Sequence, residues 1–580
     1  MRSVFSHINA RRSPLVLALL VASTLAACGG GGGDAPGGGA SSALTLSGTV
    51  ATGAAVAGGA IDAKCSAGIA SGTTQADGSY SISIAGGTWP CLLRVTTAGG
   101  VVLHSVAAGS GASATANVTP VSQLILASLA AADPVGYYAS FDSAAAAAIS
   151  STAVAEAQAR VVVLLKAAGI DLGALGDLIS APLRAKTATG AGDAYDQALD
   201  TLASALASSG TTLAALTTAA IGNALPPTAD PITSLPAELL LRRATPTCAA
   251  MRSATYRIVT PTASATMADQ SGLAVFDAAT LRITRPDGTT GTWTANGNCR
   301  FTDQGSGYSA DVVVSQAGVL VGRYTRNNGA TYKNFVGFPE QAHALAELAG
   351  DWNVMGMSPV AAGFVGNAGS ATLDAAGVLT AGATCQNNGT WAVDVCVTLS
   401  SAAIALFPPF VADSTGGFDS IDAPTQTVTG RAFAYKNGGG GVMLATVGKG
   451  GSFAFWAPKR TLLLPTIGAV TGNWNFDIVA SLASASANYE RSNTIKAIDA
   501  ASGSYSRIQK TPGTNNDHPE TLFVNNPRAG FAFRPAGSSV AVDGSVQNIN
   551  EFTSLRMAGM GFGVLVLPPL KLFEFFAVQP

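Results

Sequence analysis

The sequence predicts a multidomain, mainly β protein in which a helical segment separates two strand-rich regions. Three observations lead to this fold class. Residues 44–119 carry short apolar runs that alternate at period two between glycine-rich turns, residues 120–246 carry apolar residues at helical spacing, and residues 247–580 contain an internal repeat. The length of 580 residues is enough for several domains of about 150 residues each.

The chain begins with a basic leader and a short apolar core. Arg2, Arg11 and Arg12 precede a run of mainly Leu, Val and Ala over residues 15–25, which is too short to cross about 30 Å of hydrocarbon comfortably as a permanent helix. A positive leader, an apolar core and small residues before a cut are typical of an export signal. Residues 28–43, rich in Gly, Ala, Ser and Pro, then predict a flexible tether.

The end of the leader, Leu25-Ala26-Ala27-Cys28, resembles the lipobox of bacterial lipoproteins. The resemblance implies that residues 1–27 are removed, that the Cys28 thiol is diacylated and that its new amine is acylated. Two or more acyl chains hold a protein firmly to a bilayer, because each buried CH₂ contributes about 0.8 kcal/mol. Gly29, in place of the Asp that marks inner-membrane retention in many such lipoproteins, favours the outer membrane of a Gram-negative bacterium. The alternative is a cysteine that merely ends a signal peptide or membrane helix.

Residues 44–119 predict a small antiparallel β-sandwich with a tight Asp-Gly turn at Asp77. The opening Gly48-Thr49-Val50 and the run Asp77-Gly78-Ser79-Tyr80-Ser81-Ile82 resemble the carboxypeptidase regulatory-like (transthyretin-like) β-sandwich. In that family the module is non-catalytic, which implies a folding or binding appendage here.

Residues 120–246 predict a small helical bundle, or a helical layer packed on the sandwich. Asp142-Ser143 is expected to cap one long Ala-rich helix that runs to Lys166 and is stopped by Gly169. Prolines between residues 226 and 246 predict a boundary with the region that follows. The other expected helices cover residues 121–132, 193–208, 211–223 and 236–242.

Residues 247–580 predict three tandem β units, either as separate sandwiches or as one joint barrel-like body. The units are residues 247–347, 348–468 and a degenerate copy at 469–580. A Gly-Arg motif at Arg323 recurs at Arg431, and the apolar C-terminal run from Gly561 is expected to form packed strands. An Asp-Ala-Ala turn and a tryptophan also recur, at Asp277, Asp374 and Asp499 and at Trp293, Trp352, Trp391 and Trp474.

Six cysteines follow Cys28, and an even number in an exported chain indicates disulfides. They fall two by two within the predicted segments, which favours the pairs 65–91, 248–299 and 385–396 among the fifteen connectivities that six thiols allow. Zinc is the weaker alternative, because there is no Cys-x-x-Cys and no nearby histidine. The six are Cys65, Cys91, Cys248, Cys299, Cys385 and Cys396.

The sequence shows no catalytic constellation. Gly-x-Ser-x-Gly and His-Glu-x-x-His are missing, and the glycine runs at Gly29 and Gly438 lack the residues of a phosphate-binding loop, which leaves them as tether and turn. We therefore predict no catalytic residue, no metal site and no cofactor. The net charge of −2 and the lack of a basic patch argue against nucleic-acid binding.

Three weaker candidates each have a plainer interpretation. Asp517, His518 and Glu520 could hold a metal or sense pH, but a solvated loop is favoured. The repeated aspartates could be paired carboxylates for glycosidic chemistry, but capping of their own turns is favoured. The repeated tryptophans could stack on sugars, but core positions are favoured.

The sequence thus predicts a lipid-anchored cell-envelope protein whose β repeats bind a glycan, a peptide or another envelope protein without catalysing a reaction. A polysaccharide hydrolase and an assembly or secretion accessory are the alternatives. The hydrolase requires two repeat acids that converge about 5–9 Å apart in an aromatic-lined cleft.

Overall fold

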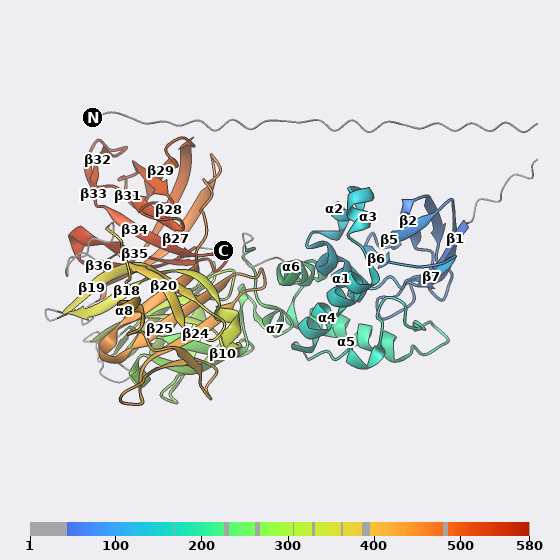
Figure 1. Cartoon of the computed structure of the whole chain (residues 1–580), viewed down its shortest axis with the longest axis horizontal. Helices are drawn as coiled ribbons and strands as arrows, with labels where there is room; N and C mark the ends of the chain where they lie inside the picture. Colours follow the sequence, from blue (N-terminus) through green and yellow to red (C-terminus); the bar gives the residue numbers. More distant parts are fainter. Residues whose placement is uncertain are drawn as a thin grey trace, which may run out of the picture. The chain divides into compact units, whose positions relative to one another are not determined.

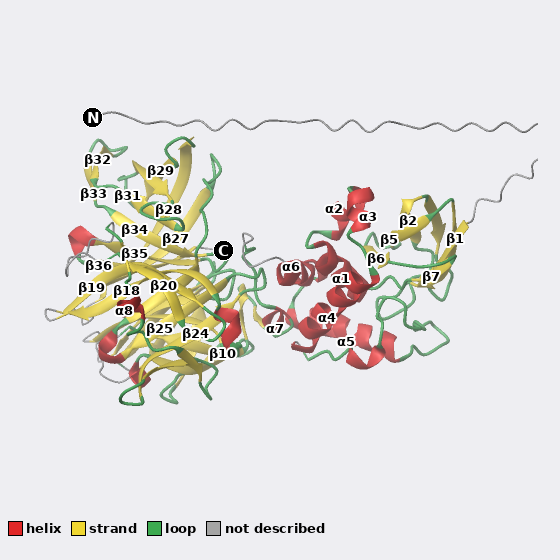
Figure 2. Cartoon of the chain, in the orientation of Figure 1, coloured by secondary structure: helices red, strands yellow, loops and turns green. Residues whose placement is uncertain are grey.

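A computed structural model describes residues 43–167, 169–224, 231–261, 267–305, 307–326, 331–360, 363–385, 395–479 and 485–578. It confirms a mainly β protein with a helical segment between two strand-rich regions (Figure 1). Helices gather in the segment from α1 to α7, and strands dominate the parts of the chain before and after it (Figure 2). Cys28, the leader and Trp391 lie outside the described residues. No helix within the described ranges is long and apolar enough to cross a membrane.

The first strand-rich region forms two sheets, with strand orders β4-β1-β7 and β3-β2-β5-β6, whose buried residues belong to one hydrophobic core. Tyr80, Ile82 and Ile84 of β4 are buried while the residues between them are not, which is the expected period of two. Cys65 and Cys91 stand opposite each other on β2 and β5 and form a disulfide. The strands are β1 (Ala43–Thr49), β2 (Ala60–Ala67), β3 (Ile69–Thr73), β4 (Ser79–Ala85), β5 (Thr88–Thr96), β6 (Val102–Ala107) and β7 (Ser113–Thr115).

The helical segment contains two short helices that were not predicted, α2 and η1, and it differs from the prediction again between Asp142 and Lys166. The single helix expected from Asp142 to Lys166 is wrong, because the Ser150 hydroxyl accepts the Ala153 N–H at 3.1 Å and starts a new helix there. Asp142 does cap the first piece, with Oδ1 2.9 Å from the Ala145 nitrogen. The helices are α1 (Pro120–Ala130), α2 (Pro134–Ala139), α3 (Ser143–Ala147), α4 (Ser151–Ala167), η1 (Gly173–Leu175), α5 (Ala194–Ser209), α6 (Leu213–Ala224) and α7 (Ala237–Leu240).

The first repeat unit is a closed antiparallel barrel of eight strands, in which β17 pairs back onto β10. A short hairpin of β8 (Ala244–Thr245) and β9 (Cys248–Arg252) precedes it, and η2 (Met267–Asp269) leads into β11. The barrel strands are β10 (Ala254–Val259), β11 (Ser271–Asp277), β12 (Arg282–Thr284), β13 (Thr290–Ala295), β14 (Arg300–Gly305), β15 (Tyr308–Val314), β16 (Leu320–Arg326) and β17 (Thr331–Pro339).

The second unit is an open sheet of nine strands in the order β21-β20-β19-β18-β26-β25-β24-β23-β22. Its first strand, β18, lies inside the sheet and pairs with β19 on one side and with β26, the last strand of the unit, on the other. The strands that follow β19 in the chain extend the sheet on the first side, and those that precede β26 extend it on the second. The elements are η3 (Leu345–Leu348), β18 (Gly350–Val360), β19 (Gly363–Leu373), β20 (Leu379–Thr384), β21 (Val397–Thr398), α8 (Ser401–Ile404), β22 (Phe410–Ala412), β23 (Phe418–Asp422), β24 (Thr427–Lys436), β25 (Val442–Gly448), η4 (Lys449–Gly451) and β26 (Phe453–Pro458).

The third unit is a second closed barrel, β27-β28-β29-β30-β31-β34-β35-β36, with a separate hairpin of β32 and β33. Its last two strands contain the apolar C-terminal run, as the sequence predicts. The elements are β27 (Val470–Val479), β28 (Ala485–Asp499), β29 (Ser504–Lys510), β30 (His518–Val524), β31 (Phe531–Arg534), β32 (Gly537–Val540), β33 (Val546–Ile549), β34 (Phe552–Met557), β35 (Phe562–Leu567), η5 (Pro568–Leu570) and β36 (Leu572–Val578).

The repeated Gly-Arg motif occupies matching places in the first two units. Arg323 of β16 stands directly opposite Asp311 of β15, and Arg431 of β24 stands directly opposite Asp419 of β23. The nitrogen–oxygen distances within the two pairs are 3.5 and 2.9 Å. The same cross-strand ion pair is therefore present in both units, although one closes into a barrel and the other stays open.

The barrels and the open sheet share one hydrophobic cluster, which includes Val336 of β17, Phe455 of β26 and Phe575 of β36. The ring centroids of Phe455 and Phe575 are 5.5 Å apart. In addition, the guanidinium of Arg300 in the first barrel lies 3.8 Å from the ring centroid of Trp474 in the second. The three repeat units therefore pack against one another through their outer faces.

Several close contacts join the helical segment to the repeat units. The buried Arg252 of β9 donates from Nη1 to the carbonyl oxygens of Ser209, Leu240 and Arg242 at 2.8–2.9 Å. The glycine run between β24 and β25 approaches the helical segment backbone to backbone, since a Cβ on Gly438 would lie 2.0 Å from the Leu235 carbonyl oxygen. This close approach explains why the turn is built of glycine.

Candidate ligand-binding site in the first barrel

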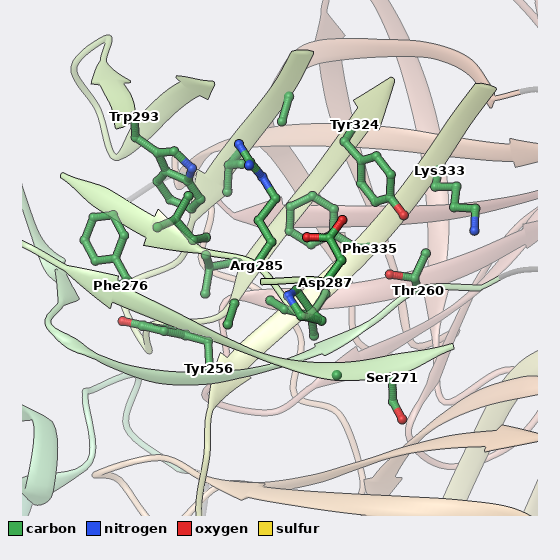
Figure 3. A pocket seen from close by; sticks show the side chains of 18 of the residues that line it. Tyr256, Thr260, Ser271, Phe276, Arg285, Asp287, Trp293, Tyr324, Lys333 and Phe335 are labelled. Carbon is green, nitrogen blue, oxygen red and sulfur yellow. The ribbon is translucent and has the colours of Figure 1, made fainter. Parts of the chain in front are cut away.

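The first barrel contains a cavity of about 490 Å³ (Figure 3). Alternate residues of each strand point inward, so Tyr256 and Ile258 of β10 line the cavity while Val259 faces the cluster shared with the other units. An eight-stranded barrel is just wide enough either to be filled by its own side chains or to hold one small ligand. A cavity of this volume leaves room in the barrel for one small ligand.

One end of the cavity is apolar and aromatic. The rings of Phe276 and Trp293 lie 5.1 Å apart, and Figure 3 shows them beside Tyr256 at this end. Met251 of β9 also lines the cavity, and the disulfide between Cys248 and Cys299 ties that strand to the β13–β14 turn. The disulfide therefore fixes this end of the cavity covalently, because it joins β9, which precedes the barrel, to the turn between β13 and β14.

The facing wall carries a second row of rings from β15, β16 and β17. The ring centroids of Tyr308 and Tyr324 are 6.0 Å apart, and those of Tyr324 and Phe335 are 6.1 Å apart. Gly322 faces inward in the same row, and a Cβ there would lie 2.6 Å from the Phe335 ring. The missing side chain of Gly322 therefore makes room for Phe335 on the adjacent strand.

A buried ion pair interrupts these aromatic walls. Arg285 donates to Asp303, whose side chain is 2% exposed, and its guanidinium carbon lies 4.3 Å from the ring centroid of Tyr308. Burial disfavours the charged guanidinium, but the hydrogen bond to Asp303, the negative charge of Asp303 and the contact with Tyr308 together outweigh burial and raise the pKa of Arg285. A Cβ on Gly291 would lie 2.3 Å from Arg285 and 2.7 Å from Asp303, so this inward-facing glycine is what admits the pair.

The other end of the cavity is polar. Thr260, Ser271 and Lys333 lie there together with the hydroxyl of Tyr324 (Figure 3). Asp287 also lines the cavity from the turn between β12 and β13, where its Oδ1 accepts the Thr289 N–H at 3.0 Å. The site thus combines an apolar closed end with hydroxyl and charged groups at the opposite end.

The repeated aspartates do not form a site. Each accepts backbone N–H groups of its own turn, with Oδ1 2.9 Å from Ala279 N for Asp277, 2.9 Å from Ala376 N for Asp374 and 3.0 Å from Ala501 N for Asp499. The predicted turn-capping role is confirmed, and the three carboxylates belong to three different sheets. Of the four repeated tryptophans, Trp293, Trp352 and Trp474 lie within the described residues and are buried as predicted.

The prediction of a solvated loop at residues 517–520 is wrong for His518 and Glu520. Alternate residues of β30 are buried, and these two are among them. The Glu520 side chain is fully buried and pairs with Arg507 and Arg534 at 2.5 Å each, while Asp517 pairs with Lys510 at 2.8 Å. Asp-His-Pro-Glu appears loop-like in sequence, but Glu520 meets Arg507 of the preceding strand β29 and Arg534 of the following strand β31.

The remaining cysteines are paired. Besides the first two bridges, Cys385 and Cys396 form a disulfide, so the structure has the three pairs that the sequence favours. Within the described part of the chain, no three His, Cys, Asp or Glu side chains come together in a way that could hold a metal ion.

Sequence reasoning missed most of the cavity. Arg285, Tyr308, Tyr324 and Phe335 were not singled out, although Tyr308, Ala310 and Val312, and likewise Lys333 and Phe335, share one parity on their strands. That parity was readable from the sequence. The closure of the strands into a barrel with unfilled space inside could not be predicted from the sequence, because closure depends on pairing between β10 and β17.

Comparisons with known proteins do not identify a family. No family model matches the chain, and no curated protein matches it. Among solved structures, it is similar to the isotype 1 transferrin binding protein B from serogroup B Neisseria meningitidis, with 9% identity, a TM-score of 0.17 and coverage of 60% of this chain and 78% of the other. A putative outer membrane protein from Bacteroides fragilis gives 10% identity, a TM-score of 0.14 and coverage of 41% and 100%. A protein of unknown function from Nostoc punctiforme gives 11% identity, a TM-score of 0.15 and coverage of 41% and 98%.

Proposed function

We propose that this chain is a lipid-anchored envelope protein that binds a small molecule in its first barrel and catalyses no reaction on it. The observation that carries this proposal is the cavity of about 490 Å³ inside the first barrel, with aromatic side chains on two walls. Ligand pockets of about 300–1,000 Å³ that are mainly apolar, with a few convergent polar groups, are typical of small-molecule sites. The seven strands of the first region, which form two sheets, support the regulatory-like sandwich as a non-catalytic appendage.

The polysaccharide hydrolase has lost its support. That reading required repeat acids that converge in a cleft, but Asp277, Asp374 and Asp499 each cap a turn on a separate sheet. The most buried acid beside the cavity, Asp303, is already bonded to Arg285.

Binding can be tested with a matched pair of substitutions on one strand. Ala274 lines the cavity from β11, whereas its neighbour Val275 is 53% exposed on the outer face. Ala274→Phe places a ring inside the cavity, and Val275→Phe adds the same ring outside. We expect native mass spectrometry and organic extraction of the full mature chain, purified from envelopes in detergent, to find a retained small molecule other than the detergent in the wild type and in Val275→Phe but not in Ala274→Phe. Equal retention by all three proteins would place the molecule elsewhere.

The lipid anchor is tested separately at Cys28, which lies outside the described residues. Replacing Cys28 with Ser removes the thiol that would carry the diacylglyceryl group, so metabolic labelling with a fatty acid should disappear and the leader should remain uncut by the lipoprotein route. Persistent label on Cys28→Ser would show that the acyl chains are attached elsewhere, and a wild-type chain without label would show that it is not a lipoprotein.

A further inference from the structure

We infer that the molecule held by the first barrel is uncharged and built around a flat ring system. This inference rests on the proposed small-molecule function of the cavity and names the chemical class of its ligand. Three features of the cavity wall support it: the positions of the aromatic side chains, the positions of the charged side chains, and the balance between positive and negative charges.

The rings favour a flat partner. Phe276 and Trp293 occupy the closed end, and Tyr308, Tyr324 and Phe335 form a row across the facing strands. Aromatic side chains gain about 0.5–1.5 kcal/mol beyond area burial when they meet another ring in an offset or edge-to-face arrangement. A ligand that lies between two aromatic walls gains most if it presents ring faces and edges to both.

The charges exclude an ionic group from the closed end. The charged residues that line the cavity are two acids, Asp269 and Asp287, and two bases, Arg285 and Lys333, so the lining contributes no net charge. Arg285 is moreover bonded to Asp303 behind the wall. An ionised group buried among Phe276, Trp293 and Met251 would therefore lose its hydration without meeting a counter-charge there, which is strongly unfavourable.

The opposite end supplies groups suited to a neutral polar substituent. The hydroxyls of Thr260 and Ser271 can each donate to a carbonyl or accept from a hydroxyl group of a ligand. A ring system with one hydroxyl or keto group at its edge would place that group among these hydroxyls and its rings at the closed end.

The test uses two fluorescent probes with the same ring framework and different charge. N-phenylnaphthylamine is neutral, and anilinonaphthalene sulfonate carries one negative charge on the same fused rings. Titrated into residues 28–580 with Cys28→Ser, expressed without the leader so that no acyl chain is attached, the neutral probe should bind with one site per chain and at least about tenfold more tightly than the sulfonate, a difference of about 1.4 kcal/mol. Ala274→Phe should abolish the neutral probe's site, and Val275→Phe should retain it.

The outcomes separate this inference from the function beneath it. If the sulfonate binds as tightly as the neutral probe, or more tightly, and Ala274→Phe abolishes its binding, the cavity is a ligand site but the uncharged class is wrong. If neither probe binds, or if Ala274→Phe changes nothing, the cavity itself is not a binding site and the proposed function fails. A thermal unfolding scan of each variant identifies a loss of binding that is due to misfolding. If Ala274→Phe does not fold, Ala310→Leu, at another inward-facing position of the wall, takes its place and should weaken neutral-probe binding in the same way.

Discussion

Arg285 and Tyr308 are stacked inside the first barrel, with the guanidinium carbon 4.3 Å from the ring centroid. Arg285 follows β12 and Tyr308 begins β15, so the contact crosses the barrel interior between strands that are not neighbours in the sheet. Asp303 of β14 holds the guanidinium in this position from the other side. The pair is therefore part of the cavity wall and part of what fixes the shape of the barrel.

Removing the charge of Asp303 should destabilise the first barrel. Asp303→Asn leaves Arg285 as a charge without its buried partner, and the loss of one member of a buried pair costs about 3–5 kcal/mol. Hydrogen-exchange mass spectrometry of β12 to β15 across a denaturant series measures the loss. The double variant Arg285→Met with Asp303→Leu should recover most of it, because apolar replacements remove the desolvation cost.

Asp311→Asn is the matched control, since Asp311 pairs with Arg323 in the same barrel but is 41% exposed. A partly exposed pair contributes about 0–1 kcal/mol. Equal losses for Asp303→Asn and Asp311→Asn would contradict a special role for the buried pair.

The second barrel should lose stability in acid through Glu520. Burial alone would raise the pKa of this carboxyl, but the charges of Arg507 and Arg534 outweigh it and lower the pKa. A lowered folded-state pKa gives stability that is present above the unfolded value of about 4.3 and is lost as the pH falls through the folded value. Denaturant midpoints of the second barrel, followed by hydrogen exchange of β29 to β31, should therefore fall below about pH 4.3 in the wild type.

Glu520→Gln should be less stable already at pH 7, because two guanidinium groups remain in the barrel without the carboxylate between them. Its midpoint should also fall less steeply in acid. A pH profile parallel to that of the wild type would mean that other carboxylates govern the acid transition.

The first sandwich should weaken at mildly acidic pH through His104. Its ring is fully buried, its Nδ1 lies 3.0 Å from Gln123 Oε1, and burial lowers its pKa from the ordinary 6.5 despite that hydrogen bond. The folded state therefore resists protonation, and its stability should decline as the pH falls below about 6.5. His104→Phe keeps a ring beside Tyr138 and should make the stability of this region less dependent on pH. The measurement is the unfolding of residues 43–130 within the whole chain between pH 7 and 5.5. A slope that His104→Phe leaves unchanged would assign the titration to another group.

Arg252 should hold the helical segment to the first barrel. Arg252→Met removes the donor to the carbonyl oxygens of Ser209, Leu240 and Arg242 and leaves them buried without it, at a cost of about 3 kcal/mol. Faster hydrogen exchange should appear at the C-terminal end of α5, in α7 and in β9. Arg252→Lys, which keeps the charge but not the planar fork, should give an intermediate effect. Unchanged exchange in α5 and α7 would show that apolar packing alone maintains the junction.

Local patterns were enough to predict the class of fold and many of its elements. Asp142 and Asp277 cap the turns expected of them, because an Asx cap depends only on residues two or three positions away. The break in the long helix was missed because Ala-rich helix propensity runs through residues 143–166, and only the Ser150 cap shows where the chain restarts.

Features that depend on distant strands were not accessible in this way. The burial of Glu520 requires Arg507 and Arg534 from two other strands, and nothing near it in sequence announces them. The first unit closes because β17 pairs with β10, while the second, with the same Asp–Arg cross-strand pair, does not close. The cavity exists because the first unit closes into a barrel and the second does not. The sequence motifs therefore predicted the repeat but not the cavity.

The hydrophobic cluster that contains Phe276 and Trp293 continues through the helices to Leu44 at the start of the sandwich. A molecule that occupies the barrel and binds only its folded form adds about 2.7 kcal/mol to the free energy of unfolding at one hundred times its dissociation constant. Because the packing is continuous, part of that gain extends to segments far from the occupant. The resistance of the N-terminal sandwich to a protease would then show whether a ligand occupies the cavity of the first barrel, which lies far from the sandwich in the sequence.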